Sequence, residues 1–400
     1  MNTEHRRNEI PALQDFYTMT ATNTTRCQAR RAPTGHANAQ ALERLLARFR
    51  ARHRARISLL AARHPRLADL AATFPGLLFA LASPGHGLDP RRAIDLAIEG
   101  APLRKVAATA RVPLWVRRLP PEAFEAALGR LPDGDVFRCR IVNRLPRSPK
   151  LAPMWFQAVA DAARWGNEQV ALWIAGELDR NARRFKPEQI RLLALYAWYS
   201  ARPDTAAHRL IRKTWHPNMC LSTAADAATE WRVAVDLKLN LGERAIDPWL
   251  EPGAVMGFDF VPLCSEAQIA QEASEMRNCV RGYGRDLVHN RSRLWSIRRD
   301  GTRVATVSIG FHYRRPILDI LELEGPANSV ASKEIWAAAR RWLAWHDLLP
   351  IEPNKVARTP LDRSAWTEMW RPYWLSKRSI PDWLPLVPSR GAFARLSARA

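Results

Sequence analysis

The sequence of 400 residues lacks the features that would place it in a membrane or give it a disulfide framework. No run approaches the roughly 20 apolar residues that a transmembrane helix needs. The polar N-terminal stretch contains no apolar segment typical of a secretory signal. The five cysteines are odd in number and form no Cys-x-x-Cys pair, so neither a disulfide framework nor a zinc ribbon is predicted. We therefore expect a cytoplasmic protein without a membrane span.

Acidic residues and lysine are both scarce. The chain has 61 Lys+Arg against 39 Asp+Glu, for a formal net charge of +22, and only eight of the basic residues are lysine. This balance disfavours an acidic chaperone or a binder of cationic ligands. It favours a polyanionic partner, with nucleic acid first and an anionic membrane surface second. GC-rich coding also raises arginine content, so the excess is either functional or compositional.

Hydropathy patterning divides the chain into four parts. Residues 1–40 are polar and aperiodic, which predicts disorder. Residues 41–243 show helical periodicity interrupted by prolines and no fixed repeat, which predicts a basic, irregular α-helical array. Residues 244–350 carry a different pattern, and residues 351–400 form a basic tail rich in tryptophan. Helices are expected in the array at about 121–131, 154–165, 168–183, 187–199, 205–215 and 224–241.

The pattern of residues 244–350 predicts an α+β module. After a loop-like stretch, Ser265 and Gln268 form a capping box that begins a helix toward Met276. Extended runs at 294–298 and 304–311 are joined by Asp300-Gly301, a strong hairpin signal, and a third run follows at 317–323. We expect a small antiparallel three-stranded meander flanked by helices. The closing helix, at 333–345, should cover one face of the sheet and bury Ile335, Trp336, Leu343 and one of Trp342 or Trp345.

The tail contains Trp366, Trp370 and Trp374 at intervals of four, followed by Trp383. Pro372 argues against one continuous helix there. Tryptophans beside basic residues can stack on nucleic-acid bases, but such aromatics more often pack a tail onto the preceding domain. We expect the tail to pack on the α+β module.

A row of arginines is the first candidate binding site. Arg44, Arg48, Arg52 and Arg56 recur every fourth residue, a spacing that places them on one side of a helix about 6 Å apart. The row is predicted to be exposed and to contact nucleic-acid phosphates. Two alternatives remain open: the solvated face of a packed helix and a helix lying on a membrane surface.

Residues 103–119 are similar to a helix-turn-helix. Small Ala107 permits close helix crossing, and Val112 would lie under the turn. Arg111, however, stands where glycine often adopts the left-handed conformation. The second helix before Pro120 is also too short to read several bases. The segment is therefore either a DNA-reading motif or, more commonly, an ordinary helical corner.

Cys279 is a candidate nucleophile. His289 or His312 would serve as its base, and Arg277, Arg281 and Arg285 would lower the pKa of its thiol. The alternative is a small buried core residue between apolar neighbours, with no histidine in reach. These histidines with Cys264 and Cys279 match no metal-ligand spacing, and no Walker loop, HExxH or GxSxG motif is present. No metal or cofactor is therefore expected.

Five ordered blocks of sequence resemble the PcfJ-like family over about residues 246–350. They are Met276 to Val280, Gly282-Tyr283, Trp295 to Arg298, Gly301 with Val304 to Val307, and Glu324 to Asn328. The positions that carry the resemblance are Met276, Asn278, Cys279, Val280, Gly282, Tyr283, Ser296, Arg298, Gly301, Thr306, Gly325 and Asn328. The family takes its name from a conjugative-plasmid protein. The resemblance implies an accessory protein of a mobile genetic element or phage. It indicates this genetic context and does not indicate which reaction, if any, the protein catalyses.

Two positions depart from the family pattern. Asn278 stands where the family commonly has histidine, and Ser308 where it commonly has glutamate. Neither side chain can act as a general base near neutral pH, which disfavours catalysis. We therefore expect a nucleic-acid-associated protein. The alternatives are an enzyme centred on Cys279, with Asn278, Arg298 and Asn328 as weak catalytic candidates, and a non-catalytic adaptor that binds a protein partner.

Overall fold

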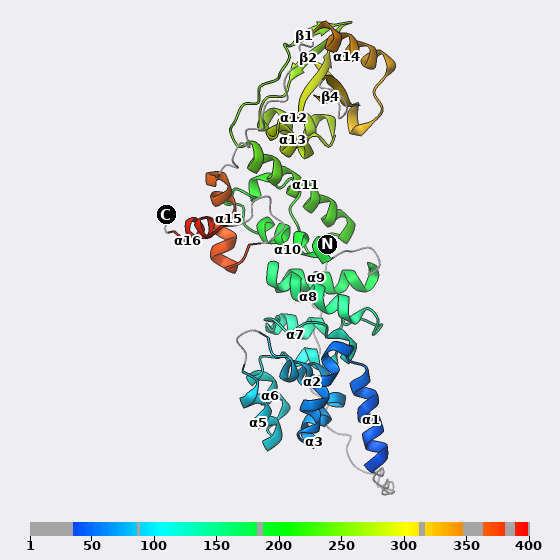
Figure 1. The fold of residues 1–400 in the computed structure, drawn as a ribbon, viewed down its shortest axis with the longest axis vertical. Helices are drawn as coiled ribbons and strands as arrows, with labels where there is room; N and C mark the ends of the chain where they lie inside the picture. Colours follow the sequence, from blue (N-terminus) through cyan, green and yellow to red (C-terminus); the bar gives the residue numbers. More distant parts are fainter. Residues whose placement is uncertain are drawn as a thin grey trace, which may run out of the picture. The chain divides into compact units, whose positions relative to one another are not determined.

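The computed structural model describes residues 35–85, 89–181, 187–311, 317–346, 363–380 and 389–398. Within these ranges, sixteen α-helices and a five-stranded sheet confirm the α+β class (Figure 1). The chain divides into two units between Arg44 and Leu45, inside helix α1 (Gly35–Ala47). Everything described below belongs to the second unit unless α1 is named. No described helix is long and apolar enough to cross a membrane.

The first half of the second unit is an array of short helices. Prolines at the first helical position begin α3 and α4, because their missing N–H would have no partner there anyway. Left-handed Gly100, at φ +86°, ends α5. The elements are α2 (Ala51–Ala62), α3 (Pro65–Thr73), α4 (Pro75–Ala82), α5 (Arg91–Glu99), α6 (Leu103–Thr109), the 3-10 turns η1 (Leu114–Arg118) and η2 (Pro121–Ala123), and α7 (Asp135–Ile141).

Longer helices complete the array. They are α8 (Ala152–Trp165), α9 (Glu168–Asn181), α10 (Pro187–Ser200) and α11 (Leu221–Leu241), with the 3-10 turn η4 (His208–Leu210) before the last. Helix α8 packs on α9 and α10, and α10 packs on α11. The buried indoles of Trp155 and Trp231 donate to backbone carbonyls at 3.1 and 2.8 Å, so these two rings are packed with their N–H groups paired. Four of the predicted helices are therefore confirmed, with shifts of a few residues at their ends.

Two expected helices of the array are wrong. The segment predicted at 121–131 contains only η2 and then runs irregularly to residue 134. Tertiary contacts stabilise this segment in a non-helical conformation. The Trp115 indole donates to the carbonyl of Pro132 at 2.9 Å, and the Glu168 carboxylate accepts the N–H groups of Asp133 and Gly134 at 3.0 and 2.9 Å. The segment predicted at 205–215 forms turns and η4 instead.

The α+β module holds an antiparallel sheet in the order β1-β2-β3-β4-β5, with five strands where three are predicted. The strands are β1 (Gly253–Val255), β2 (Phe258–Pro262), β3 (Ser292–Arg299), β4 (Thr302–Phe311) and β5 (Leu318–Glu324). The predicted hairpin is confirmed, since Arg299 pairs with Thr302 across Asp300-Gly301. The missed hairpin turns at Met256-Gly257, where both residues have positive φ as a type I′ turn requires. Methionine is an unusual first residue for that turn, so the sequence signal was weak.

Helices cover both faces of the sheet. On one face α14 (Lys333–Trp345) packs against Trp295, Ile297 and their neighbours, and Trp342 stacks on Phe260 with ring centroids 4.5 Å apart. On the other face lie α12 (Glu266–Met276), η5 (Val280–Tyr283) and α13 (Gly284–Val288), between the sheet and α11 (Figure 1). The short η6 (Pro326–Asn328) follows β5. Both the capping box of Ser265 and the boundaries of α14 are confirmed.

The expected burial along α14 is confirmed in part. Trp342 and Leu343 are buried, and Trp345 is 66% exposed, so one of the two tryptophans is buried as predicted. Ile335 and Trp336 are only half-buried against the same core.

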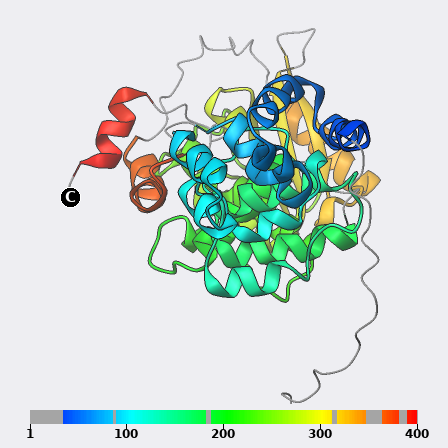
Figure 2. The same cartoon turned by 90° about the horizontal axis from the view of Figure 1, so that it is seen from below.

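The tail helices α15 (Arg363–Lys377) and α16 (Arg390–Ser397) lie beside the helical array (Figures 1 and 2). The hydroxyl of Tyr199 on α10 donates to the carbonyl of Met369, and that of Tyr373 donates to the carbonyl of Trp165 at the end of α8, both at 2.8 Å. The expectation that this part packs on the α+β module is therefore wrong for α15.

Pro372 lies inside α15, so the doubt about a continuous helix is also wrong. The helix is anchored on both sides of the proline by buried Trp370 and Tyr373. Trp366 is buried as well, and Trp374 is half-buried and donates to the Ser397 hydroxyl of α16 at 3.1 Å. These aromatics are thus used for packing. Trp383 lies outside the described residues.

Candidate functional site

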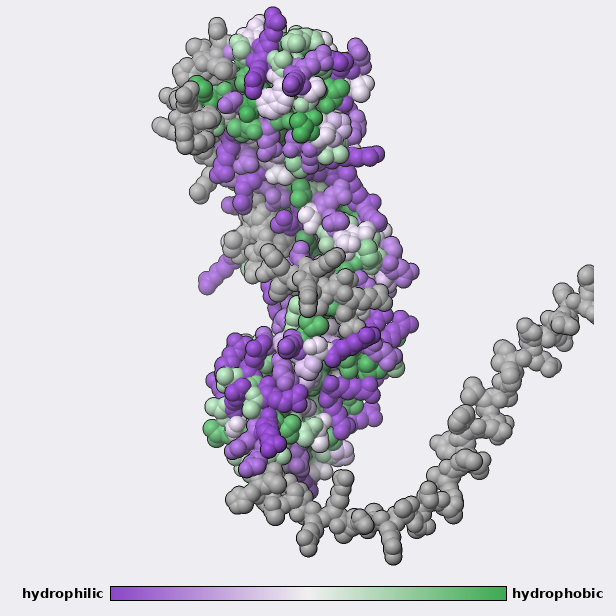
Figure 3. Space-filling model, turned by 90° about the vertical axis from the view of Figure 1, so that its right-hand side faces the viewer, coloured by the Kyte–Doolittle hydropathy of each residue, from purple (hydrophilic) through white to green (hydrophobic). Residues whose placement is uncertain are grey.

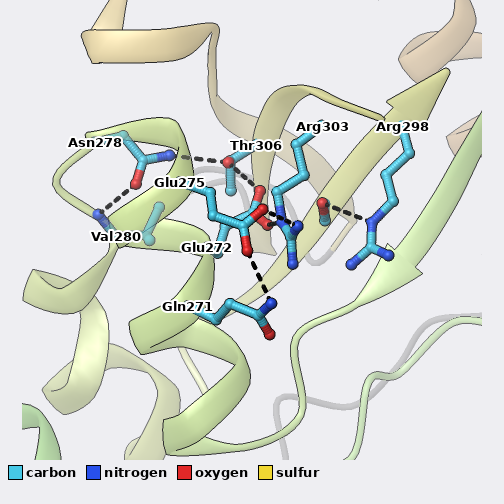
Figure 4. Close-up of polar contacts among 9 residues, drawn as sticks. Gln271, Glu272, Glu275, Asn278, Val280, Arg298, Arg303 and Thr306 are labelled. Atoms are coloured by element: carbon cyan, nitrogen blue, oxygen red, sulfur yellow. Dashed lines mark hydrogen bonds and ion pairs between the residues drawn. The ribbon is translucent and has the colours of Figure 1, made fainter. Parts of the chain in front are cut away.

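A buried polar network lies between α12 and the sheet (Figure 4). Glu272 on α12 is completely buried. Its carboxylate accepts the Thr306 hydroxyl of β4 and the Arg303 guanidinium, each at 2.7 Å, and Arg303 also pairs with Glu275. A buried carboxylate is tolerated only when it is paired and hydrogen-bonded in this way. The network fixes α12 to β4.

Asn278 extends this network. Arg277 takes a left-handed backbone, at φ +54°, and ends α12 there, which turns the next residue toward the sheet. The Asn278 amide then donates to the Thr306 hydroxyl at 2.9 Å, and its oxygen accepts the N–H of Val280 at 3.5 Å. Asn278 therefore acts as a link between the turn and β4, a role that needs hydrogen bonds and no proton transfer.

An acidic cluster lies next to the network, at the end of β5. We define it as Cys279, Tyr283, Glu322, Glu324 and Asn328. Tyr283 donates to the Glu322 carboxylate, the Cys279 thiol lies 4.0 Å from a Glu324 oxygen, and the Asn328 side chain accepts the N–H of Cys279 at 3.1 Å. Burial and the Glu322 carboxylate raise the pKa of the Tyr283 phenol. The cluster therefore holds two carboxylates beside two groups that stay protonated at neutral pH.

The predictions for Cys279 are partly wrong. Its residue is exposed rather than buried. The pKa of its thiol is raised, first by partial burial and then by the carboxylates of Glu324 and Glu322. The expected lowering by nearby arginines is thus also wrong. His289 bonds the carbonyl of Arg285 at 2.7 Å, and His312 lies outside the described residues. A raised thiol pKa is the opposite of what a nucleophilic cysteine needs.

The structure brings some of the family-motif residues together and leaves others apart. Asn278, Cys279, Tyr283, Thr306 and Asn328 all belong to the network or to the acidic cluster. Ser296 pairs with Thr306 across the strands, and its hydroxyl accepts the Arg298 guanidinium at 3.3 Å.

The remaining motif residues have structural places. Met276 and Val280 are buried in the core. Gly301 sits in the hairpin turn at φ +75°. A side chain at Gly325 would meet the Ser329 hydroxyl at 2.7 Å, whereas one at Gly282 would meet nothing within 4 Å.

The sequence analysis singled out none of Glu272, Arg303 and Glu322, and Glu324 entered it only as the first residue of a motif block. One signal was available, because Glu272 falls in the same helical stripe as Ile269, Ala273 and Met276 and a carboxylate in an apolar stripe needs a partner. The other residues come from strands whose pairing brings them near α12 only in the folded chain.

The arginine row does not lie on one helix, so that prediction is wrong. Helix α1 ends at Ala47 and α2 begins at Ala51, and buried Phe49 lies in the break. Arg48 pairs with Glu122 at 2.8 Å, and Arg52 donates to the carbonyl of Glu125. All four arginines are exposed, so the expected exposure of the row is confirmed. Half of the row is nevertheless held by η2 and by Glu125 after it.

A second basic surface lies at residues 103–118, the segment that is similar to a helix-turn-helix. We call Arg104, Lys105, Arg111 and Arg118 the basic corner. All four are exposed, and among the described residues none has a carboxylate within ion-pair distance. Arg111 does adopt the left-handed conformation, at φ +53°. The second element is the 3-10 turn η1, with buried Trp115 and Val116, and it is too short to read bases.

Cys220 is the described cysteine with the lowered pKa. It precedes α11, and the hydroxyls of Ser222 and Thr223 lie 3.4 and 3.1 Å from its sulfur. These hydroxyls, Ser222 first, lower the pKa of its thiol to about 7. No motif or spacing in the sequence singles out this cysteine.

Among the described residues, no three histidine, cysteine or acidic side chains come together as metal ligands. No protein-family model matches the chain, and no curated protein or solved structure is significantly similar to it.

Proposed function

We propose that this protein binds nucleic acid through phosphate contacts made by the basic corner. The observation that carries the proposal is the contrast between two basic surfaces. Arg48, Arg50 and Arg52 are engaged by the segment at Glu122 and Glu125. The basic corner has four cations without such partners, and residues 103–119 contain no acid. Free cations are the ones that can replace counterions on a phosphate backbone.

The surroundings of the basic corner suit a sequence-independent contact. On the face that Figure 3 shows, the right-hand side of Figure 1, most side chains at the level of α2 and α3 are hydrophilic, with small apolar spots between them. Exposed Arg92 on α5 and Arg56 on α2 add cations in the same part of the array. Because η1 is a single short turn, contacts to phosphates rather than to base edges are expected. Such binding positions a nucleic acid and does not select its sequence.

The α+β module supports the second part of the proposal, an accessory protein of a mobile genetic element. Five residues of the PcfJ-like motif meet at the network and the acidic cluster: three come from the turn at 278–283, and Thr306 and Asn328 come from more than 20 residues further along. A chance resemblance in sequence would not require this convergence. We propose that the module fixes a partner-binding surface while the array contacts nucleic acid, which implies a cytoplasmic protein.

The test is a titration of a duplex oligonucleotide at several salt concentrations. Each phosphate contact contributes about 0.9 to the slope of log affinity against log salt, so four contacts give a slope of roughly −3.6. A variant with Arg104→Gln, Lys105→Gln, Arg111→Gln and Arg118→Gln should bind more weakly and lose most of that slope. Its matched control removes four exposed arginines elsewhere: Arg209→Gln, Arg232→Gln, Arg291→Gln and Arg341→Gln.

Equal losses in the two variants would assign binding to net charge alone and refute the basic corner. Absence of binding by the unaltered protein at low salt would refute the proposed function altogether.

A further inference from the structure

A groove of about 1240 Å³ runs along the outer side of α8. Its floor includes Met154, Gln157 and Arg164 of α8. One wall is the irregular segment of residues 125–134, and Ser376 and Lys377 of α15 border the groove. The site described above contributes no residue to it.

The acidic side chains that line the groove are all engaged within the protein. Glu125 pairs with Arg50, and Asp161 pairs with Arg191 at 3.4 Å. Asp133 lies 3.9 Å from Arg138, and Glu168 accepts two backbone N–H groups.

Five cations line the groove, and Arg50 is the one that has a carboxylate partner, Glu125, among the described residues. Arg130 and Lys150 are exposed, and no side chain of the described residues contacts theirs. Arg164 lies only over the Trp165 ring, 5.0 Å from its centroid, and Lys377 donates to the carbonyl of Gly166. The groove therefore has more cations than carboxylates, and its cations without a carboxylate partner complement an acidic ligand.

The wall of the groove offers backbone hydrogen bonds. Within the described part of the chain, no N–H or C=O group of residues 126–131 has a hydrogen-bond partner. Gly129 has open space above it, since a side chain there would meet nothing within 4 Å. Leu128 and Leu131 are buried and hold the wall in place. An extended chain laid against this wall would find donors and acceptors, as in strand addition.

The length and the wall of the groove favour an extended peptide. Residues 152 to 164 of α8 extend about 18 Å, the length of five or six extended residues. The unpaired backbone groups of the wall can pair with an extended chain, whereas a helix has its own backbone groups paired along its length. Among the described lining residues the one aromatic is Phe156, which is 6% exposed and offers no platform for stacking bases.

We propose that this groove binds an extended acidic peptide segment of a partner protein. About five or six residues of the peptide would lie along the groove. Its backbone pairs with residues 126–131, and its carboxylates reach Arg130, Lys150 and Arg164. This inference does not depend on the proposed binding of nucleic acid.

The probe is an octapeptide of alternating valine and glutamate, blocked at both ends and carrying a neutral dye. Binding to the full chain is followed by fluorescence anisotropy. The same peptide with glutamine in place of glutamate should bind at least about tenfold more weakly, since each exposed ion pair contributes roughly a factor of two to five. A peptide methylated on alternate backbone nitrogens keeps its charges but loses its donors, and it should also lose binding.

On the protein side, the groove variant carries Arg130→Gln, Lys150→Gln and Arg164→Gln and should lose affinity for the peptide by about tenfold. The matched control, Arg209→Gln, Arg232→Gln and Arg341→Gln, removes the same charge outside the groove and should keep that affinity. Equal losses in both variants, or full binding of the methylated peptide, would overturn the proposal. A groove variant that still binds the peptide but no longer binds a single-stranded oligothymidine would also overturn the proposal. That result would make the groove a nucleic-acid site.

Discussion

Replacing Arg303 by methionine should strongly destabilise the α+β module. Glu272 is completely buried, and Arg303 is the only cation within ion-pair distance of its carboxylate among the described residues. Arg303→Met leaves that charge with the Thr306 hydroxyl alone. Breaking a buried ion pair by removing one partner costs about 3–5 kcal/mol, a large part of the 5–15 kcal/mol that usually separates folded from unfolded proteins.

The assay is urea unfolding, followed by the fluorescence of the tryptophans in the core of the module. The control is Arg291→Met, which removes an ion pair with Asp286 whose two side chains are 65% and 44% exposed. That pair should contribute no more than about 1 kcal/mol. The double variant Glu272→Met and Arg303→Met should recover part of the loss, because it leaves no unpaired buried charge.

A loss below about 1 kcal/mol for Arg303→Met would refute this reasoning. It would mean that the Glu272 carboxylate is not held as a buried charge by Arg303. If the double variant loses as much free energy of unfolding as the two single variants lose together, the two side chains are not coupled and the reasoning is refuted.

Three further predictions concern single residues. Iodoacetamide at pH 7 should modify Cys220 well before Cys279. Neighbouring hydroxyls lower the pKa of the Cys220 thiol to about 7, whereas burial and carboxylates raise the pKa of the Cys279 thiol. Peptide mass spectrometry measures the order of modification, and equal rates at the two cysteines would contradict the prediction. Gly301→Ala should lower the free energy of unfolding by about 1–2 kcal/mol, because φ is +75° at this position. Gly282→Ala should change it by less than about 0.5 kcal/mol, because a side chain there meets no other atom. Equal losses of stability for the two variants in thermal unfolding would exclude the left-handed turn as the cause. Burial raises the pKa of Tyr196 to about 12. The stability that protonated Tyr196 contributes is complete below pH 10 and is lost as the pH rises toward 12. Tyr196→Phe should therefore reduce the fall in stability between pH 10 and pH 12. Unfolding followed by circular dichroism measures this fall, and an equal fall in the variant and the unaltered protein would refute the prediction.

The parts of the fold that the sequence predicts well are those with local signals. Asp300-Gly301 forms its hairpin because aspartate and glycine both accept positive φ, and Ser265 caps α12 through its own side chain. The irregular wall after η2 carries a helix-like pattern, but contacts with Trp115 and Glu168 override that preference. Local propensity cannot report contacts between residues that are tens of positions apart.

The candidate site shows the same limit. The motif around Asn278 and Cys279 drew attention to the correct turn, but the charges around it come from β5 and from α12. The arginine row was predicted from its spacing alone, and that spacing assumes a continuous helix. The helix breaks where Phe49 is buried, and two of the arginines then reach the segment at Glu122 and Glu125. Which charges remain free is decided by tertiary structure.

The position of α15 bears on how the chain is made. Tyr373 contacts a carbonyl 208 residues earlier, and Met369 receives a hydroxyl from 170 residues earlier. A ribosome adding about 5–20 residues per second completes α10 roughly 8 to 35 seconds before α15 is made. During that interval the aromatic surface around Tyr199 lacks its contacts with α15, although it belongs to the core of the finished protein. Folding of the array can therefore be completed only after translation of the tail, and a nascent chain that stalls before α15 would present this surface to chaperones.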